Sequence, residues 1–62
     1  MSWTQYEVWA EEDGHQELIE TTHSKKEAVD LAKKVFNAGA GFVQVFEENS
    51  DGDYREIIKL SS

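Results

Sequence analysis

The side chains best suited to bind a metal ion lie in the segment that begins at Asn49. Asn49, Asp51 and Asp53 alternate along the chain, which is the spacing with which a calcium-binding loop begins. Such a loop also requires glycine at its sixth position and glutamate at its twelfth. Counted from Asn49, those positions hold Tyr54 and Leu60. The segment therefore predicts a hairpin turn, where asparagine, aspartate and glycine are favoured, rather than a cation site.

Residues that could take part in catalysis are few. The chain has two histidines, His15 and His23, and no cysteine, so neither the residue types nor the spacing indicate a zinc site. Ser24, His23 and Asp30 have the residue types of a catalytic triad, but no nucleophile elbow or phosphate-binding loop accompanies them. We therefore expect that the protein is not an enzyme and that it binds no cofactor and no metal.

The length and composition limit the size of the core. A chain of 62 residues predicts a single domain over residues 1–62. A domain of this size buries only about 60% of the surface that its unfolded chain exposes, and without cysteine no disulfide bond strengthens it. No stretch approaches the ~20 apolar residues of a membrane helix, and no basic and apolar signal sequence begins the chain. We expect a cytoplasmic protein that makes no contact with a membrane.

The order of periodic segments predicts an α+β fold with the element order ββαββ. Asp13-Gly14 is a strong turn signal between two extended segments. Ser24 and Glu27 have the spacing of a capping box, in which Glu27 reaches back to the Ser24 N–H, and Gly39 follows the helix as a C-terminal stop. We expect a small, mostly antiparallel four-stranded sheet with one helix packed on one face. The predicted strands span about 3–12, 16–22, 42–48 and 54–60, and the helix about 24–37. Strand orders 2-1-4-3 and 1-2-3-4 both satisfy the rules for short connections, so the order stays open.

One helix covers only one face of such a sheet, and the alternation of the first strand indicates which face. Tyr6, Val8 and Ala10 share the apolar side and are expected to lie under the helix. Trp9, together with Trp3, then points to the uncovered face.

The third strand allows two orientations. If Val43 and Val45 lie under the helix, Phe42 and Phe46 join the tryptophans on the uncovered face, and in the last strand Ile57 points the same way. In the opposite orientation Phe42 and Phe46 are ordinary core residues. The first orientation predicts an apolar protein interface made of Trp3, Trp9, Phe42, Phe46 and Ile57.

The net charge of −7 is unevenly distributed, because residues 1–23 contain no lysine or arginine. The acidic side chains of this part are Glu7, Glu11, Glu12, Asp13, Glu17 and Glu20. Such a surface repels phosphate, so we expect no direct binding to nucleic acid. It suits instead an acidic mimic of nucleic acid that inhibits a DNA- or RNA-binding enzyme, as phage anti-restriction or anti-CRISPR inhibitors do.

Two functional hypotheses follow. The first is a small protein–protein interaction module that binds another protein, expected to be a second copy of itself, through the aromatic sheet face. A large exposed apolar patch on a small domain usually marks such an interface. The acidic inhibitor is the alternative. The strand–Asp-Gly–strand–helix–strand–Asp-Gly–strand layout resembles several small bacterial or phage domains of unknown function, and this resemblance implies no functional residue.

Overall fold

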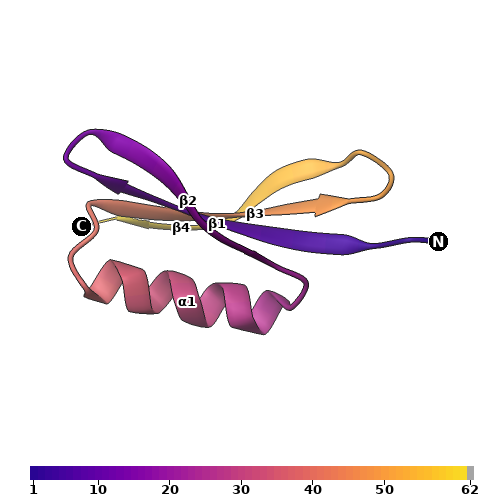
Figure 1. Ribbon diagram of the computed structural model, residues 1–62, viewed down its shortest axis with the longest axis horizontal. Helices are drawn as coiled ribbons and strands as arrows, with labels where there is room; N and C mark the ends of the chain where they lie inside the picture. Colours follow the sequence, from indigo (N-terminus) through magenta and orange to yellow (C-terminus); the bar gives the residue numbers. More distant parts are fainter. Residues whose placement is uncertain (62) are drawn as a thin grey trace.

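The computed structural model describes residues 1–61 and confirms the α+β fold. In chain order its elements are β1 (Thr4–Glu12), β2 (His15–Thr22), α1 (Lys25–Asn37), β3 (Phe42–Asn49) and β4 (Tyr54–Ser61). Every strand pair is antiparallel. Helix α1 lies along one face of the strongly twisted sheet, and Figure 1 shows the opposite face uncovered by any other element of the described residues.

The strand order is β2-β1-β3-β4, which is neither of the two orders considered from the sequence. The first strand of each hairpin lies in the centre of the sheet, and β1 pairs directly with β3. The reason is visible in the pairing of Val8 with Val45 and of Ala10 with Val43. These small apolar residues of the two central strands are buried under the helix.

The two hairpins use different turns. Asp13 and Gly14 both have positive φ angles, 53° and 83°, as a two-residue hairpin loop of the mirror-image type requires. The second turn is longer, and Gly52 adopts a φ of 90° there. Asn49 organises it, because its side-chain oxygen accepts hydrogen bonds from the backbone N–H groups of Asp51 and Asp53.

The helix begins as predicted at Ser24, whose hydroxyl accepts from the Glu27 backbone N–H at 3.2 Å. The second half of the expected capping box is wrong. Glu27 does not reach the Ser24 N–H, because the Thr22 hydroxyl occupies that position, accepting from Ser24 at 3.2 Å and donating to Glu27 at 2.9 Å. The end of β2 is thereby tied to the first turn of α1.

The helix ends at Asn37, and Gly39, two residues farther on, has the positive φ of 116° that turns the chain away from the helix axis. The Gly39 N–H donates to the Phe36 carbonyl, and the Ala40 N–H donates to that of Val35, as in a Schellman motif. Ala40 then enters the core.

The core is a thin layer of small side chains between α1 and the sheet. Its buried members are Tyr6, Val8, Ala10, Ala28, Ala32, Ala40, Val43 and Val45. Leu31 and Val35 are only partly covered and pack at the margin together with Phe36. Because the helix rests on the sheet through alanines, its longer side chains spread to the sides. The burial of Val43 and Val45 settles the orientation of β3, and Phe42 and Phe46 lie on the opposite face.

Each edge strand carries a β-bulge beside the central Val8–Val45 pair. In β2 the pairing shifts between Val8 and Trp9, so that Ile19 is the extra residue. In β4 it shifts between Val45 and Phe46, and Ile57 is extra. Such an extra residue departs from strict strand alternation. The expected outward orientation of Ile57 is therefore wrong, since its side chain packs against the core.

Candidate functional site on the uncovered sheet face

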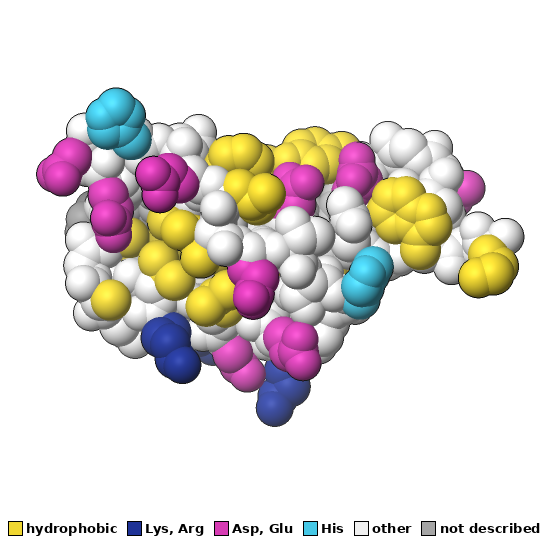
Figure 2. Space-filling view, viewed as in Figure 1, with side chains coloured by type: hydrophobic (Ala, Val, Ile, Leu, Met, Phe, Trp, Pro, Cys, Tyr) yellow, Lys and Arg dark blue, Asp and Glu magenta, His cyan; other side chains and the backbone are white. Residues whose placement is uncertain are grey.

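The sheet face opposite α1, here called the outer face, carries a mixture of aromatic and polar side chains from all four strands. The register places on it Gln5, Glu7, Trp9 and Glu11 of β1, Gln16 and Leu18 of β2, Phe42, Gln44, Phe46 and Glu48 of β3, and Tyr54, Glu56 and Lys59 of β4. Strand alternation extends the same face to Trp3, which precedes β1. Figure 2 shows hydrophobic side chains along the edge of the molecule away from the helix. Four of the five residues predicted to form an apolar interface lie here, and Ile57 does not.

The centre of the outer face is organised by Glu7. One of its carboxylate oxygens, Oε1, accepts a hydrogen bond from the indole N–H of Trp9 at 3.0 Å. The same oxygen accepts from the Tyr54 hydroxyl at 2.7 Å. The Tyr54 bond joins β4 to β1 across the intervening strand β3.

Aromatic rings on this face are packed against one another and against a cation. Phe46 and Tyr54 stack with their ring centroids 5.1 Å apart and their planes within 7°. Farther along β3, the Lys59 ammonium lies 5.3 Å from the centroid of the Phe42 ring, close enough for a cation–π interaction. Trp9, Phe42 and Phe46 are all half-buried.

Polar side chains fill the space between the rings. Gln16 donates to Gln44, which in turn donates to Glu56, so that hydrogen bonds cross the sheet from β2 to β4. Gln5 donates to Glu48 at 3.0 Å. The outer face is thus an aromatic surface crossed by acids and amides, and it is less purely apolar than the sequence predicted.

Sequence reasoning missed three contributors to the outer face. Leu18 pairs with Trp9 and is 46% exposed, and Tyr54 is 50% exposed. Gln44 links the two edge strands. A hairpin register counted back from Asp13-Gly14 would have placed Leu18 on this face.

The environment of the two tyrosines perturbs their ionisation. Burial, together with the hydrogen bond to Glu7 and the charge of that carboxylate, raises the pKa of Tyr54 to about 12. On the helix side, burial and the nearby Glu47 carboxylate also raise the pKa of Tyr6. Both phenols are therefore protonated donors at neutral pH.

The six acids predicted as one negative surface are divided between the two sides of the sheet. Glu7 and Glu11 lie on the outer face. Glu12, Asp13 and Glu17 border a shallow hollow of about 250 Å³ with His15, Ala10 and Ile19 on the helix side. Glu20 lies nearer the helix, in a groove with Leu31 and Lys34. Figure 2 shows the acids gathered near the tip of the first hairpin and lysines along the helix.

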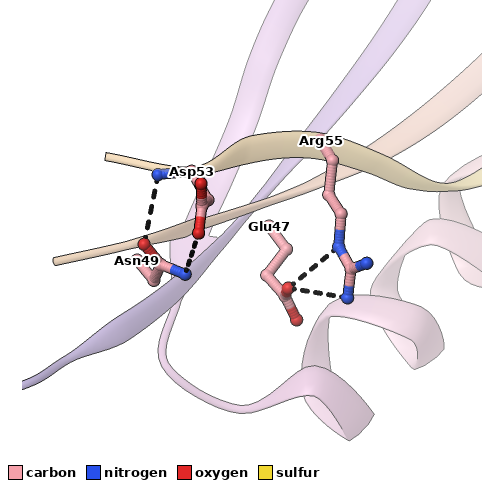
Figure 3. Close-up of polar contacts among 4 residues, drawn as sticks. All are labelled: Glu47, Asn49, Asp53 and Arg55. Atoms are coloured by element: carbon pink, nitrogen blue, oxygen red, sulfur yellow. Dashed lines mark hydrogen bonds and ion pairs between the residues drawn. The ribbon is translucent and has the colours of Figure 1, made fainter. Parts of the chain in front are cut away.

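The polar cluster at the second hairpin is structural. Arg55 and Glu47 form the one ion pair found among residues 1–61, at 3.1 Å. Beside it, the Asn49 amide donates to the Asp53 carboxylate at 3.2 Å and closes the turn, as Figure 3 shows. Within the described residues no group of three histidine or acidic side chains is placed to hold a metal ion.

Comparisons with known proteins add no family or relative: the sequence matches no protein-family model and no curated protein, and the fold matches no solved structure. Among the described residues, no helix has both the length and the apolar character needed to cross a membrane.

Proposed function

We propose that this chain is a small protein-interaction module that binds another protein through the outer face. The observation that carries the proposal is the set of half-exposed and exposed aromatic side chains on the face that α1 leaves uncovered, with Trp3 at 46% exposure and Tyr54 at 50%. Aromatic residues are enriched at the cores of protein interfaces, and a contiguous exposed patch of them is uncommon on a monomer.

The internal hydrogen bonds of the outer face support this proposal. Trp9, Glu7 and Tyr54 are held in fixed positions before any partner arrives. Ordering side chains on binding costs about 0.5–1.5 kcal/mol for each flexible residue, so a preordered surface loses less.

A second copy is the partner expected from the sequence, but the charges of the outer face oppose it. Each copy would present four carboxylates, Glu7, Glu11, Glu48 and Glu56, against one ammonium group, Lys59. A two-fold pairing brings the same patch of both copies together, so these like charges would face one another.

Selection from a displayed library of random peptides tests the proposal without a known partner. Peptides enriched on the wild-type chain are expected to lose binding to Trp9→Ala and to Phe46→Ala and to retain it on Ile19→Ala. Ile19 is the matched control, because it is an exposed apolar residue that lines the hollow on the helix side. Circular dichroism would establish that each variant is folded.

Peptides that bind all three variants equally would place recognition elsewhere and contradict the proposal. Sedimentation of the chain alone tests whether the partner is a second copy. A dimer that forms at micromolar concentration and is lost in Phe46→Ala would keep the outer face as the interface and make a second copy the partner.

The acidic inhibitor remains a second candidate because no acid of the first hairpin forms an ion pair within the described residues. Their division between two sides of the sheet is less suited to a mimic of one phosphate row. Inhibition of a panel of nucleases, with charge reversal at Glu11 and at Glu17 separately, tests it. A mimic requires one of these reversals to abolish inhibition while the chain stays folded, and inhibition that survives both removes this candidate.

A further inference from the structure

We propose that the outer face receives a cationic side chain of its partner, arginine or lysine, at a site centred on Glu7. The inference rests on the proposed function and names the chemistry of the partner. The site consists of the Glu7 carboxylate with the rings of Trp9, Phe46 and Tyr54 around it.

The Glu7 carboxylate is positioned and keeps one oxygen available. Its Oε1 accepts both internal hydrogen bonds, from Trp9 at 3.0 Å and from Tyr54 at 2.7 Å. Its Oε2 accepts none from the residues that the structure describes, and no lysine or arginine among them forms an ion pair with Glu7. A half-buried carboxylate held by two aromatic donors has its charge unneutralised and its orientation fixed.

The rings around Glu7 favour a cation as well. Phe46 pairs with Glu7 across β1 and β3 and stacks on Tyr54, so that π surfaces lie next to the carboxylate. The face of an aromatic ring attracts ammonium and guanidinium groups, and a neighbouring carboxylate adds a charge-assisted hydrogen bond. The contact of Lys59 with Phe42 shows that another ring of the same face already accepts a cation.

The charge of the whole face selects the same class of partner. With four carboxylates and one lysine, the outer face repels acidic surfaces and a second copy of itself, and attracts basic ones. The lysine is engaged over Phe42, at the end of β3 away from Phe46, so Glu7 stays open to an external cation.

Nuclear magnetic resonance titration with three blocked tripeptides tests this site. The probes are acetyl-Gly-Arg-Gly-amide, its lysine analogue and its leucine analogue. The reporter is the indole N–H of Trp9, which donates to Glu7, and the indole of Trp3 is the internal control. We expect the arginine and lysine peptides to shift the Trp9 indole resonance with dissociation constants on the order of millimolar, and the leucine peptide to leave it unmoved.

Two variants with the same change in net charge isolate Glu7. Glu7→Gln keeps an oxygen acceptor for Trp9 and Tyr54 but removes the charge, and should weaken binding of the arginine peptide by about five-fold or more. Glu12→Gln removes one charge at the exposed tip of the first hairpin, and should weaken it less than about two-fold, since exposed charge is screened within ~8 Å at physiological ionic strength.

Equal losses in the two variants would mean that the peptide senses only the overall charge, and this overturns the site. So would shifts confined to the first hairpin, or a leucine peptide that binds as well as the arginine peptide at Trp9. Binding of the leucine peptide at Trp9 would contradict only the preference for a cation, and the proposed interaction module would still hold. The same conclusion would follow if peptides selected from the library lacked basic residues but still required Trp9.

Discussion

The two edge strands, β2 and β4, are alike in layout and opposite in burial. Each has eight residues, closes a hairpin with a central strand and carries a bulge with an extra isoleucine beside the Val8–Val45 pair. Yet Ile57, Ile58 and Leu60 of β4 are partly buried and pack against the core, whereas every residue of β2 before Thr22 is exposed, including Ile19 at 42%.

The difference comes from the side chains that face the helix. In β4 these are apolar, since Ile58 pairs with Val45 and Leu60 with Val43. The matching positions of β2 hold Glu20 and Glu17, paired with Val8 and Ala10. Backbone pairing alone thus places an edge strand in the sheet, but apolar residues on the helix side decide whether it belongs to the core.

The largest expected contrast is in stability. Ile58→Ala should reduce the free energy of unfolding by about 2 kcal/mol, because it opens space at the margin of the core. Ile19→Ala should cost about 0.5 kcal/mol or less, as for most exposed positions. Urea unfolding of both variants measures this, and equal losses would remove the distinction between the edge strands.

Hydrogen exchange sharpens the comparison at the level of single amides. The β2 amides that bond to β1 should exchange about ten-fold faster than the β4 amides that bond to β3, since local opening of a strand whose side chains are almost all exposed costs less free energy than opening one with three isoleucine and leucine side chains packed on the core. Exchange followed by NMR at neutral pH provides the rates. Slower exchange in β2 than in β4 would show that β2 has support that its exposure does not reveal.

The helix cap tests the tie between β2 and α1. Ser24→Ala should destabilise the chain by about 0.5–2 kcal/mol and Ser24→Gly by only a few tenths. Because Thr22 bonds to both Ser24 and Glu27, the alanine variant should also speed exchange at the end of β2. Equal losses from alanine and glycine would mean that the hydroxyl is not the capping group.

The smallest expected effect concerns pH and the bond from β4 to Glu7. Since the folded pKa of Tyr54 is raised to about 12, the neutral phenol is the form that folding favours. Its contribution to stability is complete below the ordinary tyrosine pKa of about 10 and is lost as pH rises through the folded value. In a titration with base, the absorbance of the Tyr54 phenolate should therefore appear at higher pH in wild type than in Glu7→Gln. Identical titration curves would show that the Glu7 carboxylate does not raise the pKa of Tyr54.

Much of the fold was predictable because its signals are local. Asp13-Gly14, the Ser24 cap and Gly39 each determine a short segment by backbone preference, and the alternation of β1 assigns its two faces. The strand order was not predictable, because it depends on which strands pair beneath the helix, and no local pattern indicates that pairing. The bulge that turns Ile57 inward depends on the register of a partner strand, and no local pattern indicates it.

The candidate site was predictable only in part for the same reason. Strand alternation places Trp9 and Phe46 on the outer face. The contact between Glu7 and Tyr54 joins residues that are 47 positions apart and in strands that are not neighbours. Such a contact requires the strand order and the bulge of β4 together.

The proposed binding surface requires that Trp9 lie on a face that α1 does not cover. Trp3→Phe leaves Trp9 as the single indole, and quenching of its fluorescence by acrylamide measures the access of solvent. We predict quenching intermediate between that of a free indole and that of a core tryptophan, together with protection when a peptide selected on the outer face is bound. A Trp9 that acrylamide does not reach in the free protein would contradict the account, because it would place the indole inside the molecule and remove the binding surface.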